Sequence, residues 1–573
     1  MGHMTSKARR LNVVSLADRP TACEARQKAA ASPKYFDVSD AVLAQLRGDV
    51  MERRVEQGLR WFEDHVTSLR AVNPEHPNTA AFIGYLSQWI SLSDHATDAV
   101  RELLSFFPQP TRSRLPLDSY LHLRLAEGIL NLAAGNAETA SVHFEFIISV
   151  EEEPLHNELQ ALAHFWKAQC ERTLGNWDSA LVYATRARAR ALAIGCPSSA
   201  AMMQALEGCI HIHKGRLTRA MELLREADGV LQQTDDFVWL GNIQSAYGSV
   251  ALEEGRYELA LENFTRAVAY YRQCNRRHPD LPESLVSLAQ SKRFIAVRIA
   301  RAIDTHAERR RRSAACDSTG PTDAGARQDM EQLRADALSY LTDAIGMCDL
   351  SGESRGLALA RIERGFLLVD GGDFDRAALD AAAAFELSCK MKDQATMAAA
   401  RLLGSRIESA QYEEGIGDAP ARHAQRAHDF AKEALTCALQ TDDRRLLASA
   451  YLCQGLIFCT EFFNDAEAAG ECCRQAGQFL TAGHRNQLWD EHQTLTRKVA
   501  RTASIDSRLR EWSQGLVEGK TFQQMTEEFA DLVIPSVWER EKRNISRVVS
   551  KLSISPKKVR RILSRAGLKA AID

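Results

Sequence analysis

The sequence predicts an all-α fold, in which a superhelical solenoid of antiparallel helix pairs is followed by a small C-terminal unit of two helices around a tight turn. A glycine-centred motif recurs every forty residues, and apolar residues recur at helical three- and four-residue spacing along most of the chain. The segment 540–569 carries eleven Lys or Arg and one acid, while the formal net charge of the chain is −3. A basic helical tip on an acidic helical body follows from these observations.

The repeating motif is a glycine followed five residues later by an alanine. Its glycines, of which the first four are forty residues apart, are Gly135, Gly175, Gly215, Gly255 and Gly372. The corresponding alanines are Ala140, Ala180, Ala220, Ala260 and Ala377. Seven residues before each glycine stands a small residue: Gly128, Ala168, Gly208, Gly248 or Gly365. Seven residues after each alanine stands Ile147, Ala187, Ala227, Ala267 or Ala384.

This spacing predicts a helical hairpin in each repeat. The motif glycine ends the first helix in a left-handed turn, a conformation that glycine adopts without steric cost. The small residue before the glycine and the alanine after it let the two helices approach closely. Because one hairpin cannot bury its own apolar face, the copies must stack into a solenoid.

By these residues the chain resembles the tetratricopeptide repeat (TPR) family, over about residues 118–275 and 354–391. The period of forty implies longer helices than the usual period of about thirty-four does. Long-helix arrays of this kind are similar to those of bacterial peptide-sensing regulators and of the maltose-regulator type of transcription activator. The resemblance therefore implies a TPR-like superhelical array that senses a protein, a peptide or a small ligand.

The array is predicted to span residues 118–501, and N-terminal helical hairpins fill 36–117. Weaker copies of the hairpin are expected at 37–72, 77–107, 394–441 and 444–482. Residues 1–35 are interpreted as a flexible tail that begins with the remnant of an expression tag, and 502–520 as a linker.

One hairpin, between residues 283 and 350, is split by a small, polar insertion at about 308–328. Helix A is expected from about residue 283 to 307 and helix B from about 330 to 348, with a disordered surface loop between them. The four arginines at 309–312 either contact an acidic partner or phosphates, or are solvated charges at the end of a helix.

The composition predicts a cytoplasmic protein without a membrane partner. No apolar run approaches the ~20 residues of a membrane helix, and no secretory signal opens the chain. Thirteen cysteines at irregular spacing, without a CxxC motif, indicate reduced thiols. The cluster Cys453, Cys459, Cys472 and Cys473 is either a zinc site or helix packing, and its spacing favours packing. Cys209 and His213 lie one helical turn apart but lack an apparent third ligand.

The C-terminal segment predicts a helix at 521–540, which Pro535 kinks or divides, and then two short helices at 544–552 and 556–565. A small hydrophobic core is expected from Val548, Val549, Leu552, Ile554, Val559, Ile562 and Leu563. Ser555 is placed as an N-cap before Pro556, and Gly567 as the end of the last helix.

By the pattern from Asn544 through Ile554, Val559 and Leu563 to the Gly567–Leu568 pair, the segment 521–573 resembles the Fis-type helix-turn-helix. This unit occurs in the nucleoid protein Fis and at the C-terminus of sigma-54-type activators. The chain departs from the family in its first helix and at the turn, where Ser553 replaces the usual glycine. The resemblance implies double-stranded DNA as a partner and a homodimer on two half-sites, with the interface supplied by 521–540 or by the array.

The expected recognition helix runs from Ser555 to Arg565 in the major groove, while Asn544, Ser546 and Arg547 lie near the phosphates. The predicted DNA-binding residues are Asn544, Ser546, Arg547, Ser555, Lys557, Lys558, Arg560, Arg561 and Arg565. The alternative is a basic tail that docks onto the acidic array. Binding to DNA would weaken steeply with salt.

A polar stripe runs along the first helix of successive repeats. Its residues four positions before the first small residue are Arg124, His164, Gln204, Gln244 and Arg361. Others on the stripe are Glu127, Asn131, Lys167, Glu171, Glu207, His211 and Arg364. The stripe is either a groove that binds a peptide or a partner segment, or an exposed edge, or a set of internal salt links between neighbouring repeats.

The sequence offers no catalytic constellation. It lacks a GxxxxGK[ST] phosphate loop, and no GxSxG, HExxH or GxGxxG motif stands out. We therefore expect no enzyme, no cofactor and no metal site. The favoured hypothesis is a bacterial-type transcription regulator, in which a TPR array senses a ligand and controls a DNA-binding unit. The alternative is an interaction scaffold or chaperone-like adaptor whose basic helices dock a partner.

Overall fold

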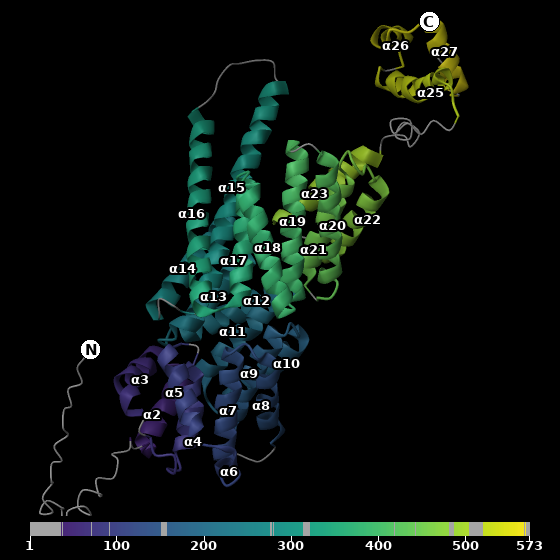
Figure 1. The fold of residues 1–573 in the computed structure, drawn as a ribbon. Coiled ribbons are helices and arrows are strands. Elements are labelled where there is room, and N and C mark those ends of the chain that lie inside the picture. Colours follow the sequence, from purple (N-terminus) through teal and green to yellow (C-terminus); the bar gives the residue numbers. More distant parts are fainter. Residues whose placement is uncertain are drawn as a thin grey trace, which may run out of the picture. The chain divides into compact units, whose positions relative to one another are not determined.

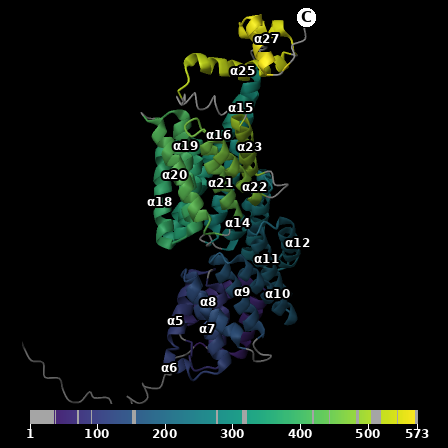
Figure 2. The same ribbon diagram turned by 90° about the vertical axis from the view of Figure 1, so that its right-hand side faces the viewer.

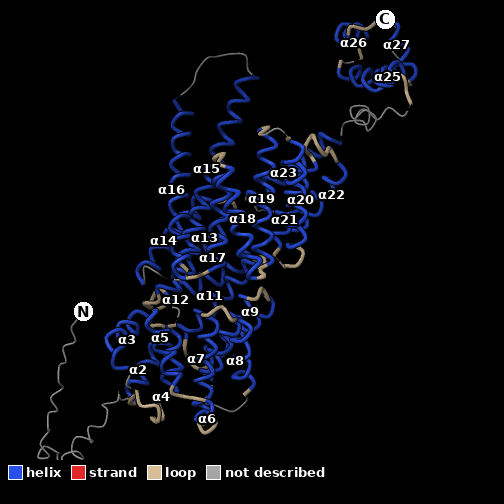
Figure 3. The backbone as a smooth tube through the Cα atoms, viewed as in Figure 1, coloured by secondary structure: helices blue, strands red, loops and turns tan. Residues whose placement is uncertain are grey.

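The computed structural model describes the chain with interruptions in loops and at both ends. The described residues are 36, 38–69, 72–90, 92–150, 157–274, 278, 280–312, 321–416, 419–441, 443–480, 486–503, 519–541, 543–566 and 568. They form 25 α-helices and one short 3₁₀ helix (Figures 1 and 3). A single parallel bridge between Phe36 and Val72 is the only β-pairing in this part of the chain. Across the same residues no helix has both the length and the apolar character needed to cross a bilayer.

The chain divides into two compact units by its internal contacts. The first comprises residues 1–450 and 478–489, and the second comprises 451–477 and 490–573. The domain limits predicted from the sequence are not tested by this division and stay predictions.

The N-terminal helices precede the repeats that carry the glycine motif. They are α2 (Asp40–Met51), α3 (Val55–Leu69), α4 (Thr79–Leu86), η1 (Ser87–Trp89), α5 (Asp94–Ser105) and α6 (Gln109–Arg112). The hairpins expected at 37–72 and 77–107 are therefore present, each with two main helices.

The repeats follow as antiparallel helix pairs, whose neighbours stack side by side in chain order (Figures 1 and 2). The pairs are α7 (Leu117–Ala133) with α8 (Ala137–Ser149), α9 (Asn157–Thr173) with α10 (Trp177–Ala193), α11 (Pro197–His213) with α12 (Leu217–Leu231), α13 (Phe237–Glu253) with α14 (Tyr257–Cys274), α15 (Leu281–Arg312) with α16 (Pro321–Ser351), α17 (Ser354–Asp370) with α18 (Phe374–Met391), and α19 (Gln394–Glu414) with α20 (Pro420–Ala438). The all-α, TPR-like solenoid predicted from the sequence is confirmed.

The remaining helices lie towards the C-terminus. They are α21 (Arg444–Phe458), α22 (Ala466–Phe479), α23 (Gln487–Ala503), α25 (Phe522–Arg540), α26 (Ile545–Leu552) and α27 (Pro556–Arg565). The weaker hairpins expected at 394–441 and 444–482 are confirmed as α19 with α20 and α21 with α22.

The motif glycines perform the role that the sequence predicts. All five adopt a left-handed backbone, with φ between 68° and 82°. Each follows the first helix of its pair and lies two residues before the second helix begins. The motif alanines and the residues seven positions after them are also at most 1% exposed, as expected for the seam between the two helices.

The small residues seven positions before the glycines allow the close approach of the two helices. A Cβ added at Gly128 would lie 2.5 Å from the Phe144 ring, and one at Gly248 would lie 2.8 Å from the Phe264 ring. Such separations are too short for carbon atoms, so glycine leaves the space that the aromatic ring of the second helix fills.

The second repeat solves the same packing problem differently. In the first, third and fourth repeats the residue sixteen positions after the small residue is Phe or Leu, packed on glycine. In the second repeat the small residue is Ala168, and the residue sixteen positions later is Ala184, with both side chains fully buried. The volume gained on one helix is therefore offset by volume lost on the other.

The expected loop at about 308–328 is shorter than predicted. Helix α15 continues through the four arginines at 309–312, and α16 begins at Pro321, so helical hydrogen bonding extends into both ends of the insertion. Only residues 313–320 lie outside the described residues. The arginines thus belong to a long helix rather than to a loop, which corrects the sequence-based assignment.

Substituting Gly248 with Ala tests the close approach. We expect Gly248→Ala to destabilise the array by about 1–3 kcal/mol, because the new methyl group collides with Phe264. Gly229→Ala in α12 is the matched control, since no atom lies within 4 Å of its added Cβ. Removing a helical glycine there should be neutral or stabilise by about 0.5–1 kcal/mol. Urea unfolding followed by circular dichroism measures both variants, and equal effects would contradict the packing account.

Candidate functional site

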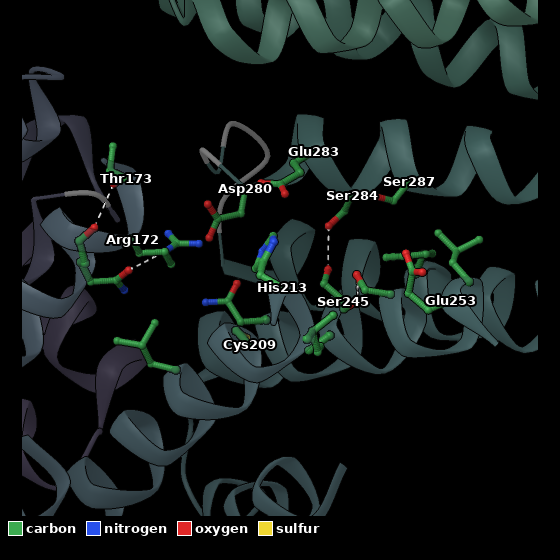
Figure 4. A pocket seen from close by; sticks show the side chains of 18 of the residues that line it. Arg172, Thr173, Cys209, His213, Ser245, Glu253, Asp280, Glu283, Ser284 and Ser287 are labelled. Carbon is green, nitrogen blue, oxygen red and sulfur yellow. Dashed lines mark hydrogen bonds between the residues drawn. The ribbon is translucent and has the colours of Figure 1, made fainter. Parts of the chain in front are cut away.

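A cavity of about 660 Å³ lies within the first unit. Its walls are the first helices of three successive repeats, α9, α11 and α13, together with the start of α15. Residues far along the chain also contribute to the lining, namely Asp443, Arg444, Arg445, Ala448, Phe479, Leu480, Asn486, Leu488 and Trp489. Figure 4 shows side chains from several of these helices converging on one space.

The cavity wall has the periodicity of the repeat. Lining residues at equivalent positions, forty residues apart, are Trp166, Leu206 and Ala246, then Gln169, Cys209 and Ser249, then Thr173, His213 and Glu253. Each repeat therefore turns the same face of its first helix to the cavity. This face can be recognised in the sequence, because the sets that begin with Gln169 and Thr173 are polar or small, whereas a packed helix face would be apolar.

The polar stripe that we predicted as a groove lies on the other side of these helices. Its positions, such as His164 and Lys167, precede the cavity-lining positions Trp166 and Gln169 by two residues. Two residues rotate an α-helix by about 200°, so the two stripes face in nearly opposite directions. None of the five predicted groove residues, Arg124, His164, Gln204, Gln244 and Arg361, lines the cavity.

The five predicted groove residues instead pack between helices. Arg124 stacks its guanidinium 5.2 Å from the centre of the Phe146 ring in α8. His164 is 2% exposed and its Nδ1 donates to the Gln160 carbonyl oxygen at 2.7 Å. Burial lowers the pKa of this histidine. Its ring is thus held neutral inside the array.

Gln204, Gln244 and Arg361 follow the same pattern. Gln204 donates to Glu226 at 2.7 Å, and Arg361 forms an ion pair of 3.3 Å with Asp380 in α18. Gln244 is 8% exposed.

Other members of the stripe form ion pairs with the second helices. Lys167 pairs with Glu145 of the preceding repeat at 3.0 Å, and Glu207 pairs with Arg188 of the preceding repeat at 2.7 Å. These contacts correspond to the third alternative, internal salt links between repeats. A partner-binding role for the stripe stays a prediction.

One end of the cavity carries two acids at the start of α15. Asp280 and Glu283 line this end, and Figure 4 shows them beside each other, facing Arg172 and His213. Neither carboxylate forms an ion pair within 4.0 Å among the described residues. Enclosure by the cavity walls and the neighbouring Asp280 carboxylate raise the pKa of Glu283, although its side chain reaches the solvent of the cavity.

His213 faces the same space and stacks on Trp177, with ring centroids 4.2 Å apart. Although the His213 side chain is exposed to the solvent of the cavity, the many cavity-wall atoms around it and the nearby positive charge of Arg172 lower the pKa of this imidazole to about 4. The ring is therefore neutral near pH 7. The same enclosure raises the pKa of the Cys209 thiol to about 11, which keeps it protonated.

Hydroxyl groups and a histidine also line the cavity. The Ser245 and Ser284 hydroxyls join α13 to α15 across 2.9 Å. Tyr271 donates its hydroxyl hydrogen to Asn242 at 2.5 Å and stacks on His278, with ring centroids 4.9 Å apart. These contacts hold a polar wall in place.

Two ion pairs close the cavity from opposite directions. At one side Arg53 of the N-terminal hairpins reaches Asp236, the N-cap of α13, at 2.7 Å, and both side chains are buried. At the other side Arg445 pairs with Glu253 at 2.7 Å, and Asn486 donates to the same carboxylate at 3.2 Å. Segments almost two hundred residues apart thus meet at this wall.

The C-terminal helices form a separate candidate site within the second unit. Thr521 and Gln524 form a reciprocal capping box at the start of α25, which continues through Pro535 without a break. Asn544 caps α26, and Ser555 caps α27 with Pro556 in its first turn, as the sequence predicts. Ser553 adopts the left-handed conformation between them, with φ of 52°. Gly567, the predicted helix end, lies outside the described residues, and α27 ends at Arg565.

A compact core joins the three C-terminal helices. The buried residues are Ile534, Trp538, Ile545, Val548, Val559, Ile562 and Leu563. Val549, Leu552 and Ile554, which we expected in this core, are partly buried against it. Helix α25 contributes Trp538, a core residue that the sequence analysis did not include.

The predicted DNA-binding residues lie on this module in two groups. Asn544, Ser546, Arg547, Ser555, Lys557 and Arg560 are exposed, and Lys558 is half-buried. Arg561 and Arg565 instead reach back to α25, where Arg561 pairs with Glu527 at 3.2 Å and Arg565 with Asp531 at 2.9 Å. The outward cations of α27 are therefore Lys557, Lys558 and Arg560, which form no ion pair among the described residues.

The sequence singled out two sets of possible metal ligands, the pair Cys209 and His213 and the cysteine cluster that includes Cys473, and they lie in different surroundings. Cys209 and His213 both line the cavity, and the Cys473 sulfur lies 3.5 Å from His492 Nε2. In the described part of the chain, no group of three or more His, Cys, Asp or Glu side chains is arranged to hold a metal ion.

The sequence matches no protein-family model and no curated protein. Among solved structures the chain is similar to a Rap protein complexed with competence and sporulation factor, at 12% identity and a TM-score of 0.42, covering 74% of this chain and 100% of that chain. It is also similar to a human IFIT1 dimer with m7Gppp-AAAA, at 12% identity and a TM-score of 0.42, covering 77% and 95% of the two chains. Similarity of this degree carries no argument about the present chain.

The state of His213 predicts a pH dependence of stability. Because its pKa is about 4 in the folded state and about 6.5 in the unfolded state, the unfolded chain binds a proton first as the pH falls. Stability should therefore be lost between about pH 6.5 and 4. In His213→Phe, which keeps a ring on Trp177 but cannot titrate, the fall in Tm from pH 7 to 5 should be smaller than in the unmodified protein. His306→Phe on the exposed side of α15 is the control, and an identical fall in all three proteins would refute the prediction.

Proposed function

We propose that this protein is a helical-repeat binding protein whose cavity takes up an extended peptide, either free or as a segment of a partner protein. The cavity on the shared face of α9, α11 and α13 is the observation that carries the proposal. Its volume of about 660 Å³ falls within the ~300–1,000 Å³ that is common for ligand pockets.

The chemistry of the wall favours a peptide over a purely apolar ligand. Amide and hydroxyl groups, among them Gln169, Asn242 and Ser249, offer donors and acceptors to a peptide backbone. Trp166 and Trp239 offer apolar surface to side chains. The proposal is one of binding without catalysis and without a cofactor, since the sequence contains no constellation for either.

A second candidate function rests on the C-terminal module. We propose that it binds double-stranded DNA, with α27 as the recognition helix. Supporting this are the capped helix-turn-helix geometry of α26 and α27 and the outward cations Lys557, Lys558 and Arg560. Together the two sites would make a cytoplasmic, bacterial-type regulator that acts as a homodimer. The alternative is an interaction scaffold or chaperone-like adaptor whose basic C-terminal helices dock a partner protein instead of DNA.

Peptide uptake is tested by filling the cavity. A random peptide display library selected on the full-length protein should yield peptides whose binding is lost in Ser249→Trp, because the indole occupies the space between α11 and α13. Thr265→Trp, on the exposed face of α14, is the matched control and should bind normally. If no peptide is enriched, or if both variants bind equally, the cavity is not a peptide site.

Binding to DNA is tested with Lys558→Ala/Arg560→Ala. Full-length protein should bind duplex DNA with a steep salt dependence, and the double variant should reduce the slope of log K against log salt by about 2, near 0.9 for each lost phosphate contact. Arg219→Ala/Arg266→Ala, two exposed arginines of the array, is the control. Binding that both double variants leave unchanged would favour the docking alternative.

A further inference from the structure

We propose that the end of the cavity formed by Asp280, Glu283 and His278 recognises an organic cation, an ammonium or guanidinium group, that is flanked in the ligand by a carbonyl oxygen. This inference rests on the proposed peptide-binding function and adds the chemistry of the ligand. The cation is either the free amino terminus of the peptide or the side chain of a lysine or arginine.

The first argument is the uncompensated negative charge. Asp280 and Glu283 both line the cavity at the start of α15, where acids also interact favourably with the helix dipole. The helix dipole explains why acids occur at the start of α15, but it does not explain why both side chains line the cavity. Neither acid forms an ion pair among the described residues, so within this part of the chain both carboxylates are available to a group that enters the cavity.

The second argument is that neighbouring groups do not neutralise these acids. Arg172 is the nearby cation, yet its Nε donates to Gln169 at 2.9 Å and no ion pair joins it to either carboxylate. His213 remains uncharged near pH 7. Two carboxylates with one unpaired guanidinium leave an excess of negative charge, which an enclosed wall screens less than bulk water does.

The third argument is a buried donor without an acceptor beside Asp280. His278 is 3% exposed and its Nδ1 accepts the Asp280 backbone N–H at 3.2 Å, so its neutral ring carries the proton on Nε2. Among the residues that the structure describes, this Nε2 has no hydrogen-bond partner. Leaving such a donor unsatisfied costs about 1–3 kcal/mol.

These features define one ligand chemistry. Carboxylates attract a cation, while the donor on His278 needs an acceptor such as an amide carbonyl oxygen. A peptide amino terminus carries both groups within one residue, and an arginine or lysine carries its cation on a residue with a backbone carbonyl. A metal ion fits less well, because the described residues offer no cluster of three or more ligands here.

Four short peptides test the inference on the full-length protein. Acetyl-Ala-Arg-Ala-amide is compared with its uncharged citrulline analogue, and Ala-Ala-Ala-amide with a free amino terminus is compared with its acetylated form. Binding is followed by the fluorescence of Trp166, Trp239 and Trp489, which line the cavity. We expect at least one cationic peptide to bind about tenfold or more tightly than its neutral counterpart, and the pair that differs identifies the source of the cation.

Variants of the acids connect this difference to the site. Glu283→Gln should abolish the preference for the cation, and Asp280→Asn serves as a second variant if the first one lowers the thermal stability. Glu331→Gln, an exposed acid of α16 away from the cavity, should keep the preference. A preference that survives both cavity variants, or neutral peptides that bind as tightly as cationic ones, would overturn the inference. Peptides from the display selection that still bind would then show that only the cation site, and not the cavity, was wrongly assigned.

Discussion

The close approach of the two helices in each repeat is the constraint on which the array depends. In the first, third and fourth repeats a glycine in the first helix lies against a side chain of the second, whereas Gly365 of the fifth lies against Leu403 in α19. In all five repeats a left-handed glycine turns the chain back. Where the small residue is Gly248, the partner is the Phe264 ring, and where it is Ala168, the equivalent partner position is Ala184. Because each pair is packed in the same way, successive first helices present the same face, and that repetition produces the cavity wall.

Much of the fold could be predicted because it follows from local chemistry. The glycine spacing located the turns of five hairpins, and the caps at Asn544 and Ser555 located the two short C-terminal helices. The long insertion was predicted less well. A run of arginines suggested a loop, whereas helix α15 continues through it, in keeping with the high helix propensity of arginine.

The groove predicted from the sequence and the cavity lie on the same first helices but on different faces of them. Both stripes of the first helices are polar, and polarity alone does not distinguish an enclosed salt link such as Lys167–Glu145 from a cavity wall such as Gln169. The residues that complete the cavity, including Arg53 and Arg445, come from distant segments whose positions depend on how many repeats stack. The ion pair between Arg561 and Glu527 could not be predicted from the sequence either, because it depends on where α25 packs against α27.

The most direct test compares two native cysteines on different faces of the repeat helices. Cys209 lies in the cavity wall, whereas Cys170 is fully buried between helices. Enclosure keeps both thiols protonated, with pKa values raised to about 11 and about 12. N-ethylmaleimide labelling mapped by mass spectrometry across a urea series should modify Cys209 in the folded protein at a rate independent of urea, and Cys170 only as the array unfolds. If Cys209 is as protected as Cys170, or if Cys170 reacts first, the cavity is not on this face of the helices.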